Sequence, residues 1–224
     1  MKALRIWGGV ILALALVGVC AWMWAIAWAP ARGDYAQQGI DVSDEAGKID
    51  WFTARSSNLD FAYARATVGA DVRDALFAEN WAGIYEAGIR RGALHAFSLC
   101  QLASDQAGNF TATVPRDADA LPVAIDLAFR DDCPARPERD VVLVELRQLA
   151  ATIETHSGKP VILRISPDFE AHYQVSGAID RPLWSTGMFF PPAYSARPWR
   201  LWQASTIRRI EGAERPVNWN VIAP

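Results

Sequence analysis

The distribution of apolar and polar residues divides the chain into two unequal parts. Lys2 and Arg5 precede a run from Ile6 to Ala31 that contains no charged residue. About 20 apolar residues are enough for a helix to cross a bilayer core. The run is also longer than the roughly 7–15 apolar residues at the centre of a secretory signal peptide. We therefore predict a transmembrane signal anchor over residues 6–31.

The residues that flank the apolar run predict its orientation. Positive charge favours the cytoplasmic side of a membrane, so we expect residues 1–5 to form a cytoplasmic tip. The apolar run would then cross the inner membrane once, and the rest of the chain would lie in the periplasm. Tryptophan is enriched where helices leave the bilayer, and Trp22, Trp24 and Trp28 lie near the far end of the run. A cleaved signal peptide is the alternative, with small residues for a cleavage site at Ala25, Ala27 and Ala29.

The pattern changes after the apolar run. Residues 32–38 are mostly polar and are expected to form a short tether. From Gly39 onward, short runs typical of β-strands alternate with stretches whose apolar residues recur every three or four positions, as in amphipathic helices. The predicted helices are Phe77–Ala87, Asp105–Phe110 and Val141–Thr155. The predicted strands are Gly39–Ser43, Phe61–Thr67, Gly92–Ser98, Leu121–Phe129, Pro160–Ser166, Pro182–Ser185, Arg200–Ser205 and Asn218–Ile222.

This order of elements predicts the fold class. Alternation of strand and helix indicates a parallel sheet, and after residue 180 the strands continue without helices. Strands such as Val123–Leu127 are largely apolar, which suits burial on both faces. Eight such strands close naturally into a barrel. We predict an α/β, TIM-like barrel that forms a single domain over residues 39–224, with its site at the carboxyl ends of the strands.

Charge and composition remove several classes of function. The net charge is −3 and there is no basic stripe, so nucleic acid is not an expected partner. The three histidines, His95, His156 and His172, lack the spacing of metal ligands. We therefore predict neither a metal site nor a cofactor.

The cysteines suggest one covalent cross-link. Cys20 lies within the apolar run, whereas Cys100 and Cys133 belong to the exported part. An even pair in an oxidising compartment favours a disulfide. Two unpaired, buried thiols are the alternative.

Two aspartates are the first candidates for chemistry. Asp41 follows Gly39-Ile40 at the end of the first predicted strand, and Asp126 interrupts the apolar run Pro122–Leu127. A buried carboxylate is costly unless it is hydrogen-bonded or functional. A pair of carboxylates flanking a groove is the arrangement that glycoside hydrolases use. A structural role inside the barrel is the alternative for each.

A series of short motifs resembles glycoside hydrolase family 25, the lysozymes that cut peptidoglycan. It covers essentially all of residues 39–222 in order. The resemblance implies a (β/α)5(β)3 barrel, in agreement with the strand count, and the segment from Cys100 to Cys133 looks like a Gram-negative branch. The motifs are Gly39–Ser43, Ile49–Trp51, Phe61–Thr67, Asp74–Asn80, Ala87-Gly88, Gly92–Phe97, Gln106–Phe110, Leu121–Asp126, Gly158–Val161, Pro182–Trp184, Trp202-Gln203 and Val217–Asn220.

The departures from the family pattern gather at strand ends. The family carries Asp-x-Glu after its fourth strand, with the Glu as proton donor, and here the motif reads Asp126-Leu127-Ala128. The acid of the last strand is replaced by Asn218. A tyrosine that often ends strand five is Arg164. Further departures are Val68, Leu94 and Ala204.

These observations lead to three hypotheses. The first is a membrane-anchored, lysozyme-like domain that binds peptidoglycan or another glycan but is catalytically impaired. The second is an active peptidoglycan N-acetylmuramidase that uses Asp41 and Asp126, and the third is a membrane-anchored protein-interaction module. Asp131 and Asp132 are weaker candidates to replace the missing acid. The residues expected to contact substrate are His95, Arg164, Trp184, Trp202, Gln203 and Asn220.

Arg164 has two alternative roles if it points into the groove. Its charge could bind a ligand carboxylate, or it could pair with Asp126 and neutralise it. An orientation toward the surrounding helices would exclude both.

Overall fold

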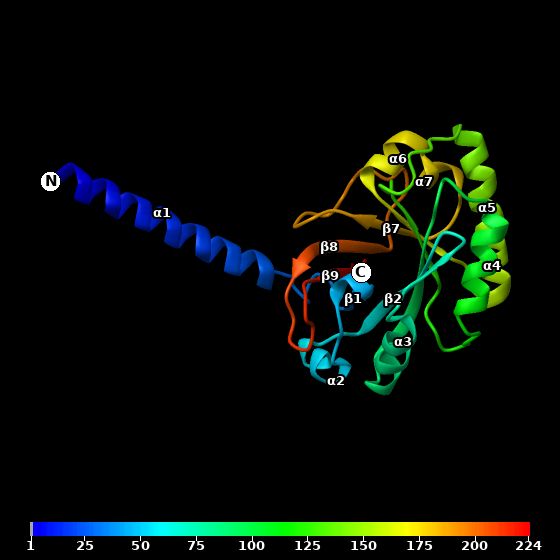
Figure 1. The fold of residues 1–224 in the computed structure, drawn as a ribbon, viewed down its shortest axis with the longest axis horizontal. Helices are drawn as coiled ribbons and strands as arrows, with labels where there is room; N and C mark the ends of the chain where they lie inside the picture. Colours follow the sequence, from blue (N-terminus) through cyan, green and yellow to red (C-terminus); the bar gives the residue numbers. More distant parts are fainter. Residues whose placement is uncertain (1) are drawn as a thin grey trace.

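The protein is described here by a computed structural model that covers residues 2–224. Met1, the first residue of the predicted cytoplasmic tip, lies outside the described residues. A long helix, α1 (Lys2–Ala27), projects away from the rest of the molecule (Figure 1). It includes most of the predicted tip and ends four residues before the predicted end of the anchor at residue 31. Within it, Gly9–Ala27 has a mean hydropathy of 2.5 and no buried residue, so it is long and apolar enough to cross a membrane.

The remaining chain forms the predicted α/β barrel. Eight strands close it in the order β1-β9-β8-β7-β6-β5-β4-β2, and β2 pairs back with β1. The hairpin partner β3 (Val72–Arg73), which the sequence did not predict, extends β2 outside the closed ring. The barrel strands are β1 (Gln38–Val42), β2 (Phe61–Val68), β4 (Arg90–Ala96), β5 (Ala124–Leu127), β6 (Ile162–Ile165), β7 (Leu183–Thr186), β8 (Leu201–Arg208) and β9 (Val217–Ile222).

Strand direction follows from where the helices lie. Neighbouring strands from β1 through β8 are parallel, because helices connect them as far as β7. β9 is antiparallel to both β8 and β1, and so closes the ring without a further helix. The helices that follow the first strands are α2 (Trp51–Ala54), α3 (Phe77–Glu86), α4 (Ala103–Thr113), α5 (Arg139–Ser157), α6 (Pro167–Tyr173) and α7 (Val175–Ala178).

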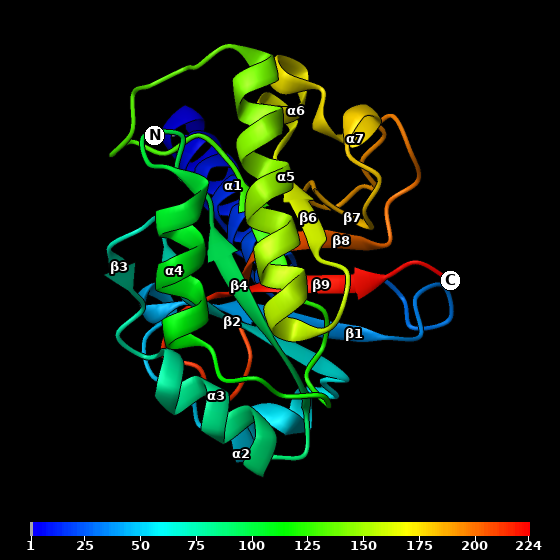
Figure 2. The same cartoon turned by 90° about the vertical axis from the view of Figure 1, so that its right-hand side faces the viewer.

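The helices cover the outside of one part of the barrel, and α4 and α5 lie side by side there (Figure 2). The predicted apolar stripe of α5 is buried, including Leu143, Leu146, Leu149 and Ile153. This helix ends at Gly158, whose left-handed conformation (φ 71°) allows its N–H to donate to the Glu154 carbonyl at 2.8 Å. The short helices α2, α6 and α7 were not predicted, because one or two turns carry too little periodicity.

Apolar side chains pack on both faces of the barrel wall. Inside, Phe61, Tyr63, Leu94 and Trp184 belong to one cluster that closes the barrel interior. Outside, a larger cluster joins the strands to the helices. The inner apolar cluster fills the barrel interior. Polar side chains therefore gather at the end of the barrel where the parallel strands finish.

Residues 28–37, between α1 and β1, lie against the barrel. Gln38 is buried and its side chain donates to the carbonyls of Pro30 and Tyr35, at 2.9 and 3.0 Å. The Trp219 indole donates in turn to the Gln38 side chain at 2.8 Å. The predicted tether is therefore a folded segment that runs directly into β1.

The structure also contains the Cys100–Cys133 disulfide, which links the end of β4 to the segment after β5.

Candidate functional site

The amide side chains of β9 hold Asp41 at the end of β1. Asp41 lies opposite Asn218 in the antiparallel pairing of these strands, and Asn220 projects from the same face of β9. The Asn218 amide donates to Asp41 Oδ2 and the Asn220 amide to Oδ1, each at 2.8 Å. Asp41 is buried, so these donors replace the water that its carboxylate has lost.

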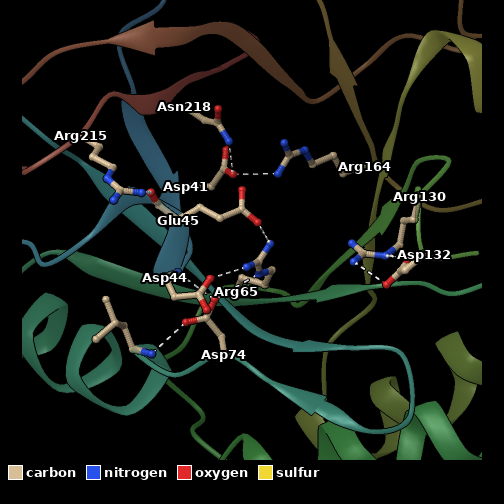
Figure 3. A network of polar contacts seen from close by, with 11 residues as sticks. Asp41, Asp44, Glu45, Arg65, Asp74, Arg130, Asp132, Arg164, Arg215 and Asn218 are labelled. Carbon is tan, nitrogen blue, oxygen red and sulfur yellow. Dashed lines mark hydrogen bonds and ion pairs between the residues drawn. The ribbon is translucent and has the colours of Figure 1, made fainter.

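Arg164 bridges the two aspartates of the site, and Figure 3 shows its contact with Asp41. Its Nη1 donates to Asp41 Oδ2 at 2.8 Å, and its Nε lies 3.4 Å from Asp126 Oδ1. Nη2 donates to the Gln203 side chain, and the guanidinium lies 5.2 Å from the centre of the Trp184 ring. Burial opposes its charge, but the two carboxylates outweigh burial and raise the pKa of Arg164. Arg164 therefore points into the barrel, as both predicted roles required, and the structure places it between the acids.

The carboxylate of Asp126 has fewer polar contacts than that of Asp41. It is level with Arg164 in the parallel pairing of β5 and β6, and 24% of its side chain is exposed. Among residues 2–224, the 3.4 Å ion pair with Arg164 is the one polar contact of its carboxylate. Burial raises the pKa of Asp126, the charge of Asp41 raises it further, and Arg164 acts in the opposite direction. Asp126 thus holds a proton more readily than an exposed aspartate does.

Both aspartates open into one cavity of about 550 Å³. Its charged lining consists of three acids and four arginines. Several of these were not among the predicted site residues. The charged lining residues are Asp41, Glu45, Asp126, Arg65, Arg130, Arg164 and Arg215.

A second ion-pair cluster forms one wall of this cavity (Figure 3). Arg65 contacts Asp44 at 2.6 Å, Glu45 at 3.0 Å and Asp74 at 3.1 Å. The backbone N–H groups of Asp44 and Leu76 also donate to Asp74, yet burial raises the pKa of Asp74 overall. The cluster ties the turn after β1 to β2. It thereby places the Glu45 side chain, which is 78% exposed, on the cavity wall.

Ala128 lines a neighbouring cavity of about 370 Å³ that shares Asp126 and Arg130 with the first. Asp131 and Asp132 lie there too. Arg130 holds Asp132 through two contacts of 3.1 Å, and this hydrogen bonding lowers the pKa of Asp132. An acid fixed as an anion by a neighbouring arginine is a poor proton donor, so Asp132 is not placed to donate a proton in this arrangement.

His95 does not line the cavity, contrary to its predicted contact with substrate. It is fully buried between Thr67 Oγ1 at 2.8 Å and Gln106 Oε1 at 3.2 Å. The Gln106 amide nitrogen donates to the carbonyls of Ser98 and Gln101, so Oε1 must accept from His95 Nε2. Burial lowers the pKa of His95 to about 4. A neutral histidine here connects β2 and β4 to α4.

The two predicted tryptophans are buried as well, on opposite sides of the barrel wall. Trp184 lies inside, and its indole donates to Asn220 Oδ1 at 3.2 Å. Trp202 faces outward, donates to the Gly187 carbonyl at 2.7 Å and packs against Trp28 and Tyr35. Neither offers a free face on which a sugar could stack. Gln203 and Asn220 do face inward, but they bind Arg164 and Asp41.

Glu45, Arg65, Arg130 and Arg215 are the lining residues that the sequence analysis missed. Arg65 had a usable signal, because it is a charged residue inside the apolar strand 61–68, the same argument that selected Asp126. The others lie in turns, where charged residues are common and carry no such signal. Within residues 2–224, no group of three or more His, Cys, Asp or Glu side chains is arranged to hold a metal ion.

Comparison with known families and proteins gives one consistent match. Residues 40–213 match the model of the family described as glycosyl hydrolases family 25. Lysozyme M1 of Streptomyces globisporus is 31% identical over 209 residues, covering 82% of this chain and 66% of the relative. The uncharacterized protein YegX of Escherichia coli (strain K12) is also 31% identical, over 84% of this chain and 70% of its own.

Solved structures agree with this match. A family 25 glycosyl hydrolase from Bacillus anthracis superposes with a TM-score of 0.79 and 31% identity, covering 88% of this chain and 92% of its own. A bacterial lysozyme from Streptomyces coelicolor superposes with a TM-score of 0.76 and 26% identity, covering 83% and 91%. The barrel topology and these matches therefore agree on one family.

Proposed function

Because the chain belongs to glycosyl hydrolases family 25, we propose that it is a membrane-anchored, lysozyme-like domain that binds cell-wall glycan with impaired hydrolysis. The observation that carries the impairment is Ala128. The family pattern has a proton-donating glutamate here, two residues after Asp126, and the methyl group of Ala128 faces the cavity that Asp126 shares.

The chemical consequence of Ala128 is a missing proton. Cleavage of a glycosidic bond requires a carboxylic acid that protonates the leaving oxygen. A positioned general acid accelerates a reaction by roughly 10²–10⁴-fold, which corresponds to about 3–5 kcal/mol of activation free energy. An alanine side chain supplies none of this.

Arg164 weakens the two remaining aspartates as catalysts. Asp41 already accepts three hydrogen bonds, and one of them comes from Arg164. The same guanidinium lies 3.4 Å from Asp126. A nucleophilic or base role would require a carboxylate free to approach substrate, whereas this charge holds both acids in place.

Glycan of the bacterial cell wall is the ligand class that the relatives suggest. The cavity offers carboxylates, guanidinium groups and the Asn218 amide, which can exchange hydrogen bonds with sugar hydroxyls and amides. The burial of Trp184 and Trp202 removes the stacking surfaces expected from the sequence. We therefore expect recognition through polar contacts.

Helix α1 supports the proposed anchor and the periplasmic location of the barrel. Its apolar length suffices to span a bilayer, and Lys2 and Arg5 favour a cytoplasmic N-terminus. Trp24 and Trp28 pack on Phe189 of the barrel, and cleavage after Ala27 would remove Trp24 and its stacking contact. The intact mass of the protein extracted from membranes tests this: the full chain supports an anchor, and a product lacking residues 1–27 contradicts it.

The proposed function is tested on the full chain in detergent micelles with insoluble peptidoglycan. We expect the protein to sediment with the glycan and to release no more soluble fragments than buffer does. Lysozyme M1 serves as the positive control for turnover. Fragment release that Asp126→Asn abolishes would contradict the impairment, and failure to sediment at low salt would favour the protein-interaction module.

A second candidate function, an active muramidase, is favoured by two observations. Asp126 has a raised pKa, which suits a proton donor, and Glu45 supplies a further carboxylic acid on the cavity wall. Its 3.0 Å ion pair with Arg65 argues against proton donation by Glu45. If turnover is detected, Glu45→Gln and Asp126→Asn identify which acid carries it.

A further inference from the structure

The loop between β7 and β8 lies on the side of the barrel from which α1 leaves (Figure 1), and it exposes apolar side chains. In the sequence Gly187-Met188-Phe189-Phe190, the Phe190 side chain is 78% exposed and Met188 39% exposed. Loop tips of soluble domains are usually polar, and an aromatic side chain this exposed costs free energy in water. The loop is nevertheless well ordered by hydrogen bonds: Gly187 N–H donates to the Gln203 carbonyl at 3.1 Å and Phe189 N–H to the Ala204 carbonyl at 2.9 Å.

Phe189 connects this loop to the end of α1. Its ring stacks on Trp24, with 5.9 Å between centroids, and meets Trp28 edge-on at 5.2 Å. Its backbone has a positive φ of 65°, uncommon for a residue with a bulky side chain. The backbone thus adopts an unfavourable conformation that keeps Phe189 against the helix and leaves its neighbour Phe190 directed outward.

Basic residues of β8 and the following turn lie at the same place. Arg208 donates to the Ala27 carbonyl and stacks on the Trp219 ring at 4.2 Å. The backbone N–H of Arg209 donates to the Ile26 carbonyl at 2.8 Å, and its side chain is exposed. The two segments that contact the end of α1 therefore carry exposed aromatic, apolar and cationic side chains. This composition is typical of the boundary between bilayer and water.

We propose that Met188, Phe190 and Arg209 form a membrane-contact patch that seats the barrel on the bilayer holding α1. This inference rests on the proposed anchoring by α1. The occupant is the lipid headgroup region, because the patch is continuous with the last turn of a helix of membrane-spanning length. Phe190 and Met188 would enter the boundary between headgroups and acyl chains, and Arg209 would meet lipid phosphates.

The patch also determines where the cavity lies. Thr206 lines the cavity, and its hydroxyl lies 3.5 Å from the Met188 sulfur. The membrane-contact patch and the cavity wall are thus in direct contact through Met188 and Thr206. A barrel seated through the patch holds its cavity beside the membrane surface, where it would bind the part of the wall closest to the bilayer.

The test measures lipid contact at three single-cysteine positions of the full chain in phosphatidylglycerol–phosphatidylethanolamine vesicles. An environment-sensitive fluorophore is attached to Phe190→Cys or to Val144→Cys, each combined with Cys20→Ser. Val144 is a matched control because it is 59% exposed on α5, on the far side of the barrel from α1 (Figure 1). The third label is on the native Cys20 of α1. Each sample is compared in vesicles with and without a lipid that carries a quencher near its headgroup.

We expect the label at position 190 to lose more than half of its emission and the label at position 144 to keep it. Equal quenching at 190 and 144, with Cys20 quenched by a deep acyl-chain quencher, would overturn the patch while leaving the anchor intact. A Cys20 label that no lipid quencher affects would instead overturn the anchor. Protection at 190 that depends on protein concentration rather than on quencher lipid would indicate contact between copies and would also overturn the proposal.

Discussion

The two aspartates of the cavity have the same chemistry but opposite surroundings. Asp41 is buried and receives hydrogen bonds from Arg164, Asn218 and Asn220. Asp126 is partly open to the cavity and contacts the side of the same guanidinium at 3.4 Å. Three hydrogen bonds hold the carboxylate of Asp41, whereas a single ion pair holds that of Asp126. The contrast shows that two acids of one cavity can differ in how many hydrogen bonds hold them.

Ala128 lies close to Asp126, the aspartate with fewer polar contacts. Ala128 follows β5 directly and shares a cavity with Asp126. Ala128 therefore lies beside the aspartate that has fewer hydrogen-bond donors. Substitutions of single residues around the two aspartates should change the free energy of unfolding by different amounts.

Arg164→Met should have the largest effect. It keeps the length of the side chain but leaves Asp41 and Asp126 without their shared cation, and breaking a buried ion pair in this way costs about 3–5 kcal/mol. Urea denaturation of the full chain in detergent measures the free energy of unfolding. Arg116→Met, at an exposed arginine, is the control. A loss below about 1 kcal/mol would show that Arg164 does not bridge the acids.

Asp41→Asn should cost about 2–3 kcal/mol, because three donors lose their anionic acceptor and a new donor faces them. The same denaturation measurement applies. The shape of the side chain is preserved, so the loss reports charge and hydrogen bonding rather than packing. If Asp41→Asn proves as mild as the equivalent change at Asp126, the proposed difference between the two acids is wrong.

Asn220→Ala should cost about 1–2 kcal/mol. It removes the donor to Asp41 Oδ1 and the acceptor of the Trp184 indole, both buried. Asn218→Ala is the matched comparison, since Asn218 also donates to Asp41 but is only half-buried. Thermal unfolding should rank Asn220→Ala below Asn218→Ala in stability, and the reverse order would contradict the assigned network.

Asp126→Asn should have the smallest effect and the opposite sign, a gain below about 1 kcal/mol at pH 7. Burial raises the pKa of Asp126 in the folded protein, so the folded state holds this proton more tightly than the unfolded chain does. The stability that this carboxyl contributes is therefore present at low pH and falls as pH rises through the folded pKa. The gain should vanish near about pH 3, where the carboxyl is protonated in both states. A gain that is independent of pH would exclude titration of Asp126 as its cause.

Much of the fold could be predicted because its elements are long or strongly apolar. The barrel class, the order of strands and the helices α3, α4 and α5 follow from periodicity, with boundaries shifted by a few residues. The pair Val72–Arg73 and the single turn Trp51–Ala54 are too short to show a period. They form because their neighbours in space position them.

The site could be predicted only in part, for a geometric reason. Adjacent residues of a strand point to opposite faces, so Trp202 and Gln203 cannot both face the cavity. The structure turns Gln203 inward and Trp202 outward. Sequence motifs identified which strand ends matter, but the direction of each side chain depends on the register of the closed barrel. Glu45 and Arg215 come from turns and had no pattern to reveal them.

The folded segment 28–37 has a mechanical consequence. Ten residues of flexible chain would let the attached barrel wander over a root-mean-square distance of roughly 17 Å. Here the hydrogen bonds of Gln38 and the ion pair of Arg32 with Asp60 remove that slack. With α1 inserted in a bilayer, the domain would sit on a rigid stalk and scan its surroundings by lateral diffusion in two dimensions. Its encounters would then be governed by the viscosity of the lipid and by the distance between bilayer and wall.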